Sequence, residues 1–149
     1  MSCNLGGMFR AMLVFAVVAC GGGASEVAVK GGDLDLARLA GDWLGDYHGT
    51  ESGRQGPIHF LLQLGQHTAD GTVLMGGSSP LKIQFIAISH DKVSGKIDPY
   101  TDPQCQCQVQ TEFDGTVGNN AIDGSFTTKV IGKDVEQHGA WSVKRTDAH

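Results

Sequence analysis

The sequence predicts an all-β protein: a single antiparallel up-and-down β-barrel of about eight strands, preceded by a signal peptide and a flexible tether. Two observations support this fold class. The 149 residues include 22 glycines and are only 7% aromatic, which favours many tight turns over long helices. From residue 40 to residue 146, short apolar stretches alternate with clusters of glycine, proline, asparagine and aspartate. This length is enough for one domain with its own core.

The N-terminal region carries a targeting signal. The apolar stretch AMLVFAVVA follows Arg10. It is shorter than the ~20 residues of a membrane-spanning helix and has the length of the apolar part of a signal peptide. We assign residues 1–19 to a signal peptide and residues 20–39 to a glycine-rich flexible linker, in which Asp33 is able to cap a helical turn. Residues 40–146 form the barrel.

The end of the apolar stretch, Val17-Val18-Ala19-Cys20, resembles the lipobox of bacterial lipoproteins. The resemblance implies cleavage before Cys20, a diacylglycerol on its sulfur and attachment of the chain to a membrane. Gly21 stands where an aspartate would, by the same resemblance, signal retention in the inner membrane. The outer membrane is therefore favoured if the cell has two. The alternatives are an ordinary signal peptide, cut at a small residue such as Ala24, and a short buried strand.

Eight strands are expected in the barrel, because alternation of apolar and polar residues gives each of them one inner face. A meander closed on itself leaves no free edge. The expected strands are Trp43–His48, Ile58–Leu64, Thr72–Gly76, Leu81–Ile88, Lys92–Ile97, Cys105–Gly115, Ala121–Thr128 and Gln137–Arg145. The expected inward side chains are Trp43, Tyr47, Ile58, Phe60, Leu62, Leu64, Leu81, Ile83, Phe85, Val93, Ile97, Val109, Phe113, Ile122, Phe126, Trp141 and Val143.

The segment LAGDWLG contains Gly41 and Trp43 as a G-x-W pair, and it resembles the opening strand of lipocalins and of avidin-like proteins. In lipocalin-type barrels the tryptophan closes one end, and a basic residue of the last strand packs across it. Arg145 fits this role by geometry as well, because the last strand of a closed eight-stranded meander runs antiparallel to the first. A guanidinium over an indole ring is a favourable contact.

The other end of the barrel is expected to be open and to carry the binding site, because its connections are longer on average. These connections are 48–57, 77–80, 98–104 and 129–136. The residues expected at this end are Tyr47, Met75, Cys105, Cys107, Thr128 and Gln137, with an outward-facing His138 beside them.

Cys105 and Cys107 alternate with glutamines in QCQCQVQ, which places both thiols inside the barrel near its open end. Residues two apart in a regular strand lie about 6.6–7 Å apart, whereas a disulfide needs Cβ atoms about 3.5–4.5 Å apart. A bond therefore requires a bulge or an irregular start of the strand. Three interpretations stay open: a buried apolar pair or a local disulfide, a soft-metal site completed by Met75 or a histidine, and a redox site.

No motif of a hydrolase, metalloprotease or phosphate-binding loop occurs, and the six histidines are scattered. Asp98, Asp102 and Asp114 are interpreted as turn residues that bond their own backbone. We therefore expect no enzyme, and no cofactor besides the lipid on Cys20. The net charge of −5 argues against a nucleic-acid partner.

We expect a lipid-anchored protein of the bacterial cell envelope, whose barrel binds a small apolar or amphipathic ligand at its open end. The first alternative is a filled barrel that acts on an envelope protein as an interaction or inhibitor module. The second alternative is a soft-metal or redox site at Cys105 and Cys107.

Overall fold

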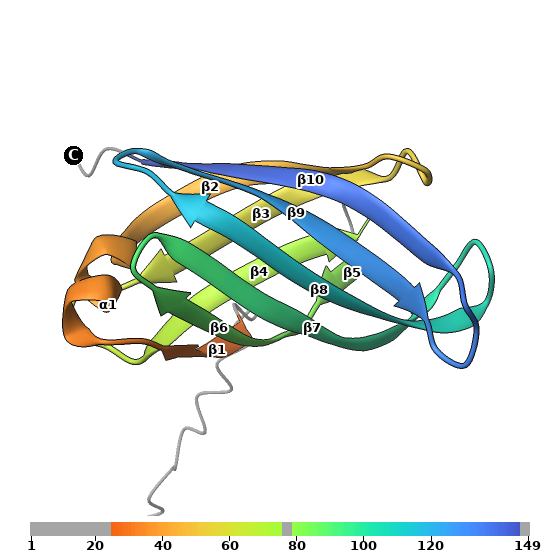
Figure 1. The fold of residues 1–149 in the computed structure, drawn as a ribbon, viewed down its shortest axis with the longest axis horizontal. Helices are drawn as coiled ribbons and strands as arrows, with labels where there is room; N and C mark the ends of the chain where they lie inside the picture. The colour runs from red at the N-terminus through yellow and green to blue at the C-terminus, as the bar shows by residue number, and fades with distance from the viewer. Residues whose placement is uncertain (1–24, 76–78, 147–149) are drawn as a thin grey trace, which may run out of the picture.

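The computed structural model describes residues 25–75 and 79–146, which form a closed β-barrel with one helix at its end (Figure 1). Nine strands close the barrel in the order β1-β6-β7-β8-β9-β10-β2-β3-β4, and β4 pairs again with β1. The prediction of a single, nearly all-β barrel is confirmed. The elements are β1 (Ser25–Lys30), α1 (Asp33–Leu39), β2 (Gly41–Gly49), β3 (Gln55–Leu62), β4 (Thr68–Met75), β5 (Ser79–Leu81), β6 (Ile83–Ser89), β7 (Lys92–Asp102), β8 (Cys107–Val117), β9 (Ala121–Val130) and β10 (Glu136–Arg145).

Each of the eight expected strands corresponds to an observed one, and neighbours from β6 through β10, β2, β3 and β4 pair antiparallel. The expected strand over Leu81–Ile88 is divided into β5 and β6, which only Lys82 separates. β10 closes the meander on β2, with Arg145 opposite Trp43 in the register.

The expectation of a flexible tether over residues 20–39 is wrong for residues 25–39. β1 is the ninth strand of the barrel, antiparallel to β4 and parallel to β6. Its sequence SEVAVK alternates, so that Val27 and Val29 point into the core and are 0% and 3% exposed. The barrel therefore begins at Ser25 rather than at residue 40. The expected signal peptide and the expected lipidation site, Cys20, lie outside the described residues.

β1 and β5 pair with different halves of β4. β1 pairs with Thr68–Gly71, toward the end of the barrel that α1 covers, whereas β5 pairs with Val73–Met75. β5 thus continues the wall beside β4 at the other end, and β1 fills the space between β4 and β6 near the helix. Below, the end opposite α1 is called the mouth.

Helix α1 covers one end of the barrel and buries Leu36 and Leu39 against the core (Figure 1). The expected helical turn is confirmed, but its N-cap is Gly32 rather than Asp33, and no side chain caps it. Within residues 25–75 and 79–146, no helix has the length and apolar character needed to cross a bilayer.

Trp43 and Arg145 form the closed end as predicted. Trp43 is fully buried and donates a hydrogen bond from Nε1 to the carbonyl of Leu39, 2.9 Å away. The guanidinium carbon of Arg145 lies 4.2 Å from the centroid of the Trp43 ring. Its Nη atoms donate to the carbonyl oxygens of Ala40 and Arg38, so Arg145 also satisfies acceptors at the C-terminal end of α1.

Gly41 is required by this arrangement. Its φ angle of +142° lies outside the range that other residues readily adopt, and a Cβ atom there would overlap Nη1 of Arg145. The glycine of the G-x-W pair thus leaves room for the guanidinium that packs on the tryptophan.

Two side chains expected inside the barrel face outward. A bulge in the pairing of β6 with β7 separates Ile83 from Phe85 and reverses the alternation after it. Ile86 points inward instead, while Phe85 lies outside below the ammonium group of Lys30, 5.1 Å from it. Leu64 follows the end of β3 and is 74% exposed.

Candidate functional site

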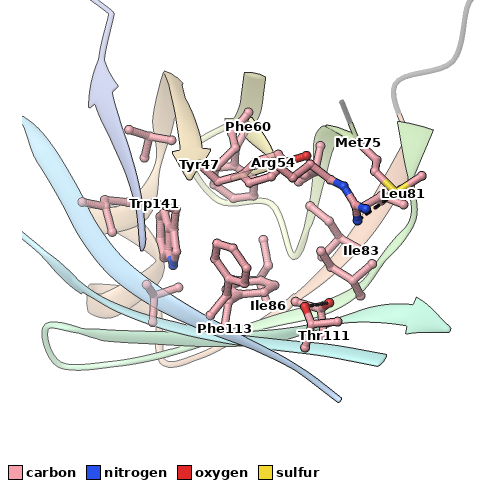
Figure 2. A pocket seen from close by; sticks show the side chains of 18 of the residues that line it. Tyr47, Arg54, Phe60, Met75, Leu81, Ile83, Ile86, Thr111, Phe113 and Trp141 are labelled. Carbon is pink, nitrogen blue, oxygen red and sulfur yellow. Dashed lines mark hydrogen bonds between the residues drawn. The ribbon is translucent and has the colours of Figure 1, made fainter. Parts of the chain in front are cut away.

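An apolar cavity runs along the barrel from Leu39, beside α1, to Arg54 and Met75 at the mouth (Figure 2). Its volume is about 120 Å³. Most of its wall is aliphatic and aromatic, and the polar lining groups gather toward the mouth. Apolar cavities of about this size hold a benzene-sized molecule.

Three aromatic rings lie over glycines of neighbouring strands. Each ring covers a glycine of a neighbouring strand: Phe113 covers Gly95, Phe126 covers Gly139, and Trp141 covers Gly124. A Cβ atom at any of these glycines would overlap the ring that covers it. The glycines therefore keep space free at the centre.

The rings also pack against one another and remain accessible from the cavity. Phe113 meets Trp141 edge to face, with centroids 5.9 Å apart, and Tyr47 meets Phe126 in the same way at 5.9 Å. Trp141 Nε1 donates to the carbonyl oxygens of Asp114 and Ser125, which orients the indole. All four rings are half-buried although they point inward, so solvent reaches them within the barrel.

Two buried hydroxyl groups lie on the cavity wall. Thr111 and Thr128 pair across β8 and β9, and their Oγ1 atoms are 2.7 Å apart. Tyr47 donates from its hydroxyl to the carbonyl of Leu74, 2.9 Å away. These bonds satisfy polar groups that would otherwise be costly inside an apolar wall.

A part-buried ion pair lies at the mouth. Both Nη atoms of Arg54 donate to the carboxylate of Asp102, at 3.0 Å each, and their side chains are 14% and 4% exposed. The hydrogen bonds from Arg54 lower the pKa of Asp102 below its ordinary value, and the same bonds raise the pKa of Arg54. Both groups are therefore charged at neutral pH. The sulfur of Met75 lies 3.7 Å from Nη1 of Arg54.

A second contact holds the segment between β2 and β3. Glu51 accepts hydrogen bonds from the backbone N–H of His138, at 2.7 Å, and pairs with its ring Nδ1 at 3.0 Å. The backbone bond from His138 is the main cause that lowers the pKa of Glu51. The segment that carries Arg54 is thus tied both to β10 and, through Asp102, to β7.

Four of the six residues expected at the open end line the cavity: Tyr47, Met75, Thr128 and Gln137. Their strands bring them together at the mouth as the meander predicts. His138, expected to face outward beside them, is exposed and borders the same opening.

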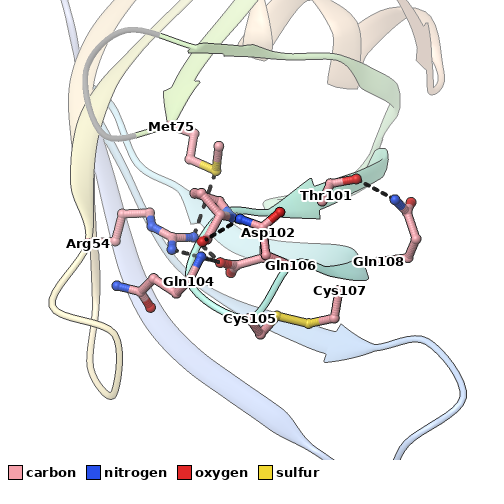
Figure 3. Close-up of a disulfide and its surroundings, with 10 residues drawn as sticks. Arg54, Met75, Thr101, Asp102, Gln104, Cys105, Gln106, Cys107 and Gln108 are labelled. Carbon is pink, nitrogen blue, oxygen red and sulfur yellow. Dashed lines mark hydrogen bonds and ion pairs between the residues drawn. A yellow bond between two sulfur atoms is a disulfide. The ribbon is translucent and has the colours of Figure 1, made fainter.

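Cys105 does not lie on the inner face, which corrects the expectation drawn from the alternation, whereas Cys107 keeps the phase of the inward Val109 and Thr111. Neither cysteine lines the cavity. β8 begins only at Cys107, and Cys105 belongs to the turn Pro103–Gln106 that joins β7 to β8. The two cysteines form a disulfide, with Cα atoms 5.1 Å apart, at the rim of the mouth (Figure 3). Cys105 is exposed and Cys107 is half-buried.

The disulfide deprives the suggested soft-metal site of its two cysteine ligands. Neither sulfur of a disulfide is a thiolate, and the third candidate ligand, Met75, contacts Arg54 instead. Nowhere in the described part of the chain do three histidine, cysteine, aspartate or glutamate side chains gather where they would hold a metal ion.

Arg54 and Asp102 were missed as site residues. Asp102 does accept a bond from the backbone N–H of Gln104, 2.8 Å away, as expected for a turn residue. Its second role depends on Arg54, 48 positions earlier, and only the closed barrel brings the two together. The sequence offered one signal, a lone arginine in the polar mouth segment ESGRQ.

Comparison of the chain with protein-family models, with curated proteins and with solved structures found no match.

Proposed function

We propose that the barrel binds a small apolar or amphipathic molecule, with the apolar part in the cavity and the polar part at the mouth. The observation that carries this proposal is the apolar cavity lined by Tyr47, Phe113, Phe126 and Trp141, whose inward rings are only half-buried. Binding there removes apolar ring surface from water, which is favourable by about 25 cal/mol per Å².

The size of the cavity limits the ligand. A volume of about 120 Å³ is below the roughly 300–1,000 Å³ of pockets for drug-sized molecules. An aromatic ring or a short branched chain fits without rearrangement. The same small volume favours, as a second candidate, a filled barrel that acts on an envelope protein through its outer loops.

The first experiment measures binding of 4-fluorotoluene, a neutral ring of suitable size, by ¹⁹F NMR. We expect saturable broadening of its signal with the wild-type protein. Ile58→Trp should abolish this effect, because Ile58 lines the cavity and the larger side chain fills it. Leu44→Trp is the matched control, since Leu44 lies on the neighbouring strand and is 49% exposed.

Unchanged binding to Ile58→Trp, or no binding to the wild-type protein, would reject the cavity as the ligand site. The second result would leave the interaction module as the better proposal.

We also propose that the chain is a lipid-anchored envelope protein. The motif Val17-Val18-Ala19-Cys20 supports this. Because β1 begins at Ser25, the chain from Cys20 to the barrel spans at most about 18 Å even when fully extended. A lipid on Cys20 would hold the barrel close to the membrane surface.

Cys20→Ala should move the protein from the membrane fraction to the soluble fraction and remove the acyl mass, because one sulfur carries the anchor. Cys105→Ala serves as the control and should stay acylated. Fractionation and intact-mass measurement of the full chain, expressed in a bacterium with two membranes, check both outcomes. An acylated Cys20→Ala protein would disprove the lipobox assignment.

A further inference from the structure

The ion pair between Arg54 and Asp102 links two strands that are not neighbours in the barrel wall. Arg54 directly precedes β3, and Asp102 is the last residue of β7. At the mouth, β4 and β5 lie between β3 and β7: β5 pairs with β4, and the N–H of Asp98 in β7 donates to the carbonyl of Lys82, directly after β5, at 2.8 Å. The pair therefore bridges over two strands at the mouth rather than joining neighbouring strands. Below, this pair is called the clamp.

The position of Asp102 depends on the turn that follows it. Its carboxylate accepts from the N–H of Gln104, and its carbonyl accepts from the N–H of Gln106, both at 2.8 Å. Gln106 has a φ angle of +53°, which a residue other than glycine adopts at a cost. Cys107 pairs with Asp102 in the register of β7 and β8, so the disulfide closes the same turn (Figure 3).

The Asp102 side chain and the disulfide differ in their access to solvent. The Asp102 side chain is 4% exposed, whereas Cys105 is exposed at the rim. A reductant in solution can therefore reach the sulfur of Cys105 without entering the barrel. Exposed disulfides are typically the ones that exchange with external thiols.

We propose that the Cys105–Cys107 disulfide is a site of thiol–disulfide exchange with a dithiol reductant, and that its reduction releases the clamp and opens the mouth of the cavity. This inference rests on the proposed ligand binding and adds that the redox state of the disulfide regulates access to the cavity. A crosslink restricts the conformations of the turn, and without it the turn must lose more entropy to hold Asp102 against Arg54. The buried Asp102 carboxylate depends on this partner, because a buried charge without one is costly.

The exchange is balanced in atoms and electrons. A thiolate of the reductant attacks Sγ of Cys105, the bond to Cys107 breaks, and the Cys107 thiolate takes up a proton. The second thiol of the reductant loses its proton and then attacks the mixed disulfide, releasing Cys105 as a thiolate that is protonated in turn. The reductant leaves as a disulfide, and two electrons have passed to the two cysteines.

Trp141 reports access to the cavity without any ligand. The chain has two tryptophans, of which Trp43 is fully buried below α1 and Trp141 lines the cavity. Quenching of the fluorescence by acrylamide therefore measures entry of a small neutral molecule to Trp141. In the full-length wild-type protein we expect the quenching constant to rise severalfold when dithiothreitol reduces the disulfide, as confirmed by intact mass.

Two variants test whether the disulfide acts on the mouth through the clamp. Arg54→Met lacks the clamp and should show the higher quenching constant even when oxidised. The double variant Cys105→Ser, Cys107→Ser should be insensitive to dithiothreitol, which excludes effects of Cys3 and Cys20. Lys129→Gln is the matched control for Arg54→Met, because it removes a surface ion pair with Glu136 and should leave quenching unchanged.

An unchanged quenching constant after complete reduction of the wild-type protein would overturn the proposal, and this test does not depend on how any variant folds. The proposal would also be overturned if dithiothreitol raised the quenching constant of the double serine variant as much as that of the wild-type protein. Binding of 4-fluorotoluene separates the two proposals. If reduction raises the quenching constant but neither the oxidised nor the reduced protein binds 4-fluorotoluene, the redox control is supported and the ligand proposal is rejected. If both states bind 4-fluorotoluene equally and the quenching constant is unchanged, the ligand proposal is supported and the redox control is rejected.

Discussion

Trp43 joins the barrel wall, helix α1 and the last strand through contacts of a single side chain. Its indole N–H bonds Leu39, and its ring carries the guanidinium of Arg145. The sequence alone predicted this contact, because the pairing of first and last strands fixes which residues meet. It did not predict that Arg145 also bonds the end of α1, since the helix was expected only as a turn within a tether.

Trp43→Ala should lower the free energy of unfolding by about 3–5 kcal/mol, the usual range for a buried tryptophan. Arg145→Ala should lower it by less, because Arg145 is only half-buried. Since the side chains contact each other, the loss in the double variant should be smaller than the sum of the single losses. Urea unfolding of the four proteins measures this coupling, and strictly additive losses would contradict the role assigned to the contact.

Asp102 should make the free energy of unfolding depend on pH in the acidic range. Its pKa in the folded protein is lowered, first by the hydrogen bonds from Arg54, relative to about 3.9 in the unfolded chain. The stabilisation is therefore fully present above the unfolded pKa and is lost as the pH falls through the folded pKa. Below about pH 4, unfolding free energies of the wild-type protein should fall toward those of Asp102→Asn. If the unfolding free energies of the wild-type protein and Asp102→Asn followed parallel curves from pH 7 to pH 2, Asp102 would not contribute to the pH dependence.

At the level of elements, the strands of the meander could be predicted because alternation is a local property of the sequence. β1 carries the same signal in Val27 and Val29, but it is short and flanked by glycines, which favoured a tether. The position of the reversal could not be read from the sequence, because Phe85 and Ile86 are both apolar and the bulge is set by the pairing of β6 with β7. The irregular start of β8 displaced Cys105 from the inner face in a similar way.

The contribution of β1 is testable with two adjacent positions. Val27→Asp should strongly destabilise the barrel or prevent folding, because it places a carboxylate without a partner among fully buried residues. Ala28→Asp should have little effect, since Ala28 is exposed on the opposite face of the same strand. Thermal unfolding compares the two variants. Equal stability would show that β1 is not part of the folded barrel in solution.

For the whole molecule, the sequence predicted a barrel with a closed and an open end, and it placed Tyr47, Met75, Thr128 and Gln137 at the open one. The clamp could not be predicted, because Arg54 and Asp102 meet only across the finished ring. The free volume could not be predicted either. It depends on rings lying over glycines of neighbouring strands, such as Phe126 over Gly139, and a pattern of inward residues does not give their orientation.

The seam between β2 and β10 has a consequence for how the protein is made. It pairs Gly49 with Gly139 and Trp43 with Arg145, residues about a hundred positions apart. A ribosome has therefore to release nearly the whole chain before the ring can close. Contacts of such long range slow folding and leave strand edges unpaired meanwhile. We expect the nascent polypeptide to stay open, with β2 lacking its partner on one edge, until its last strand arrives.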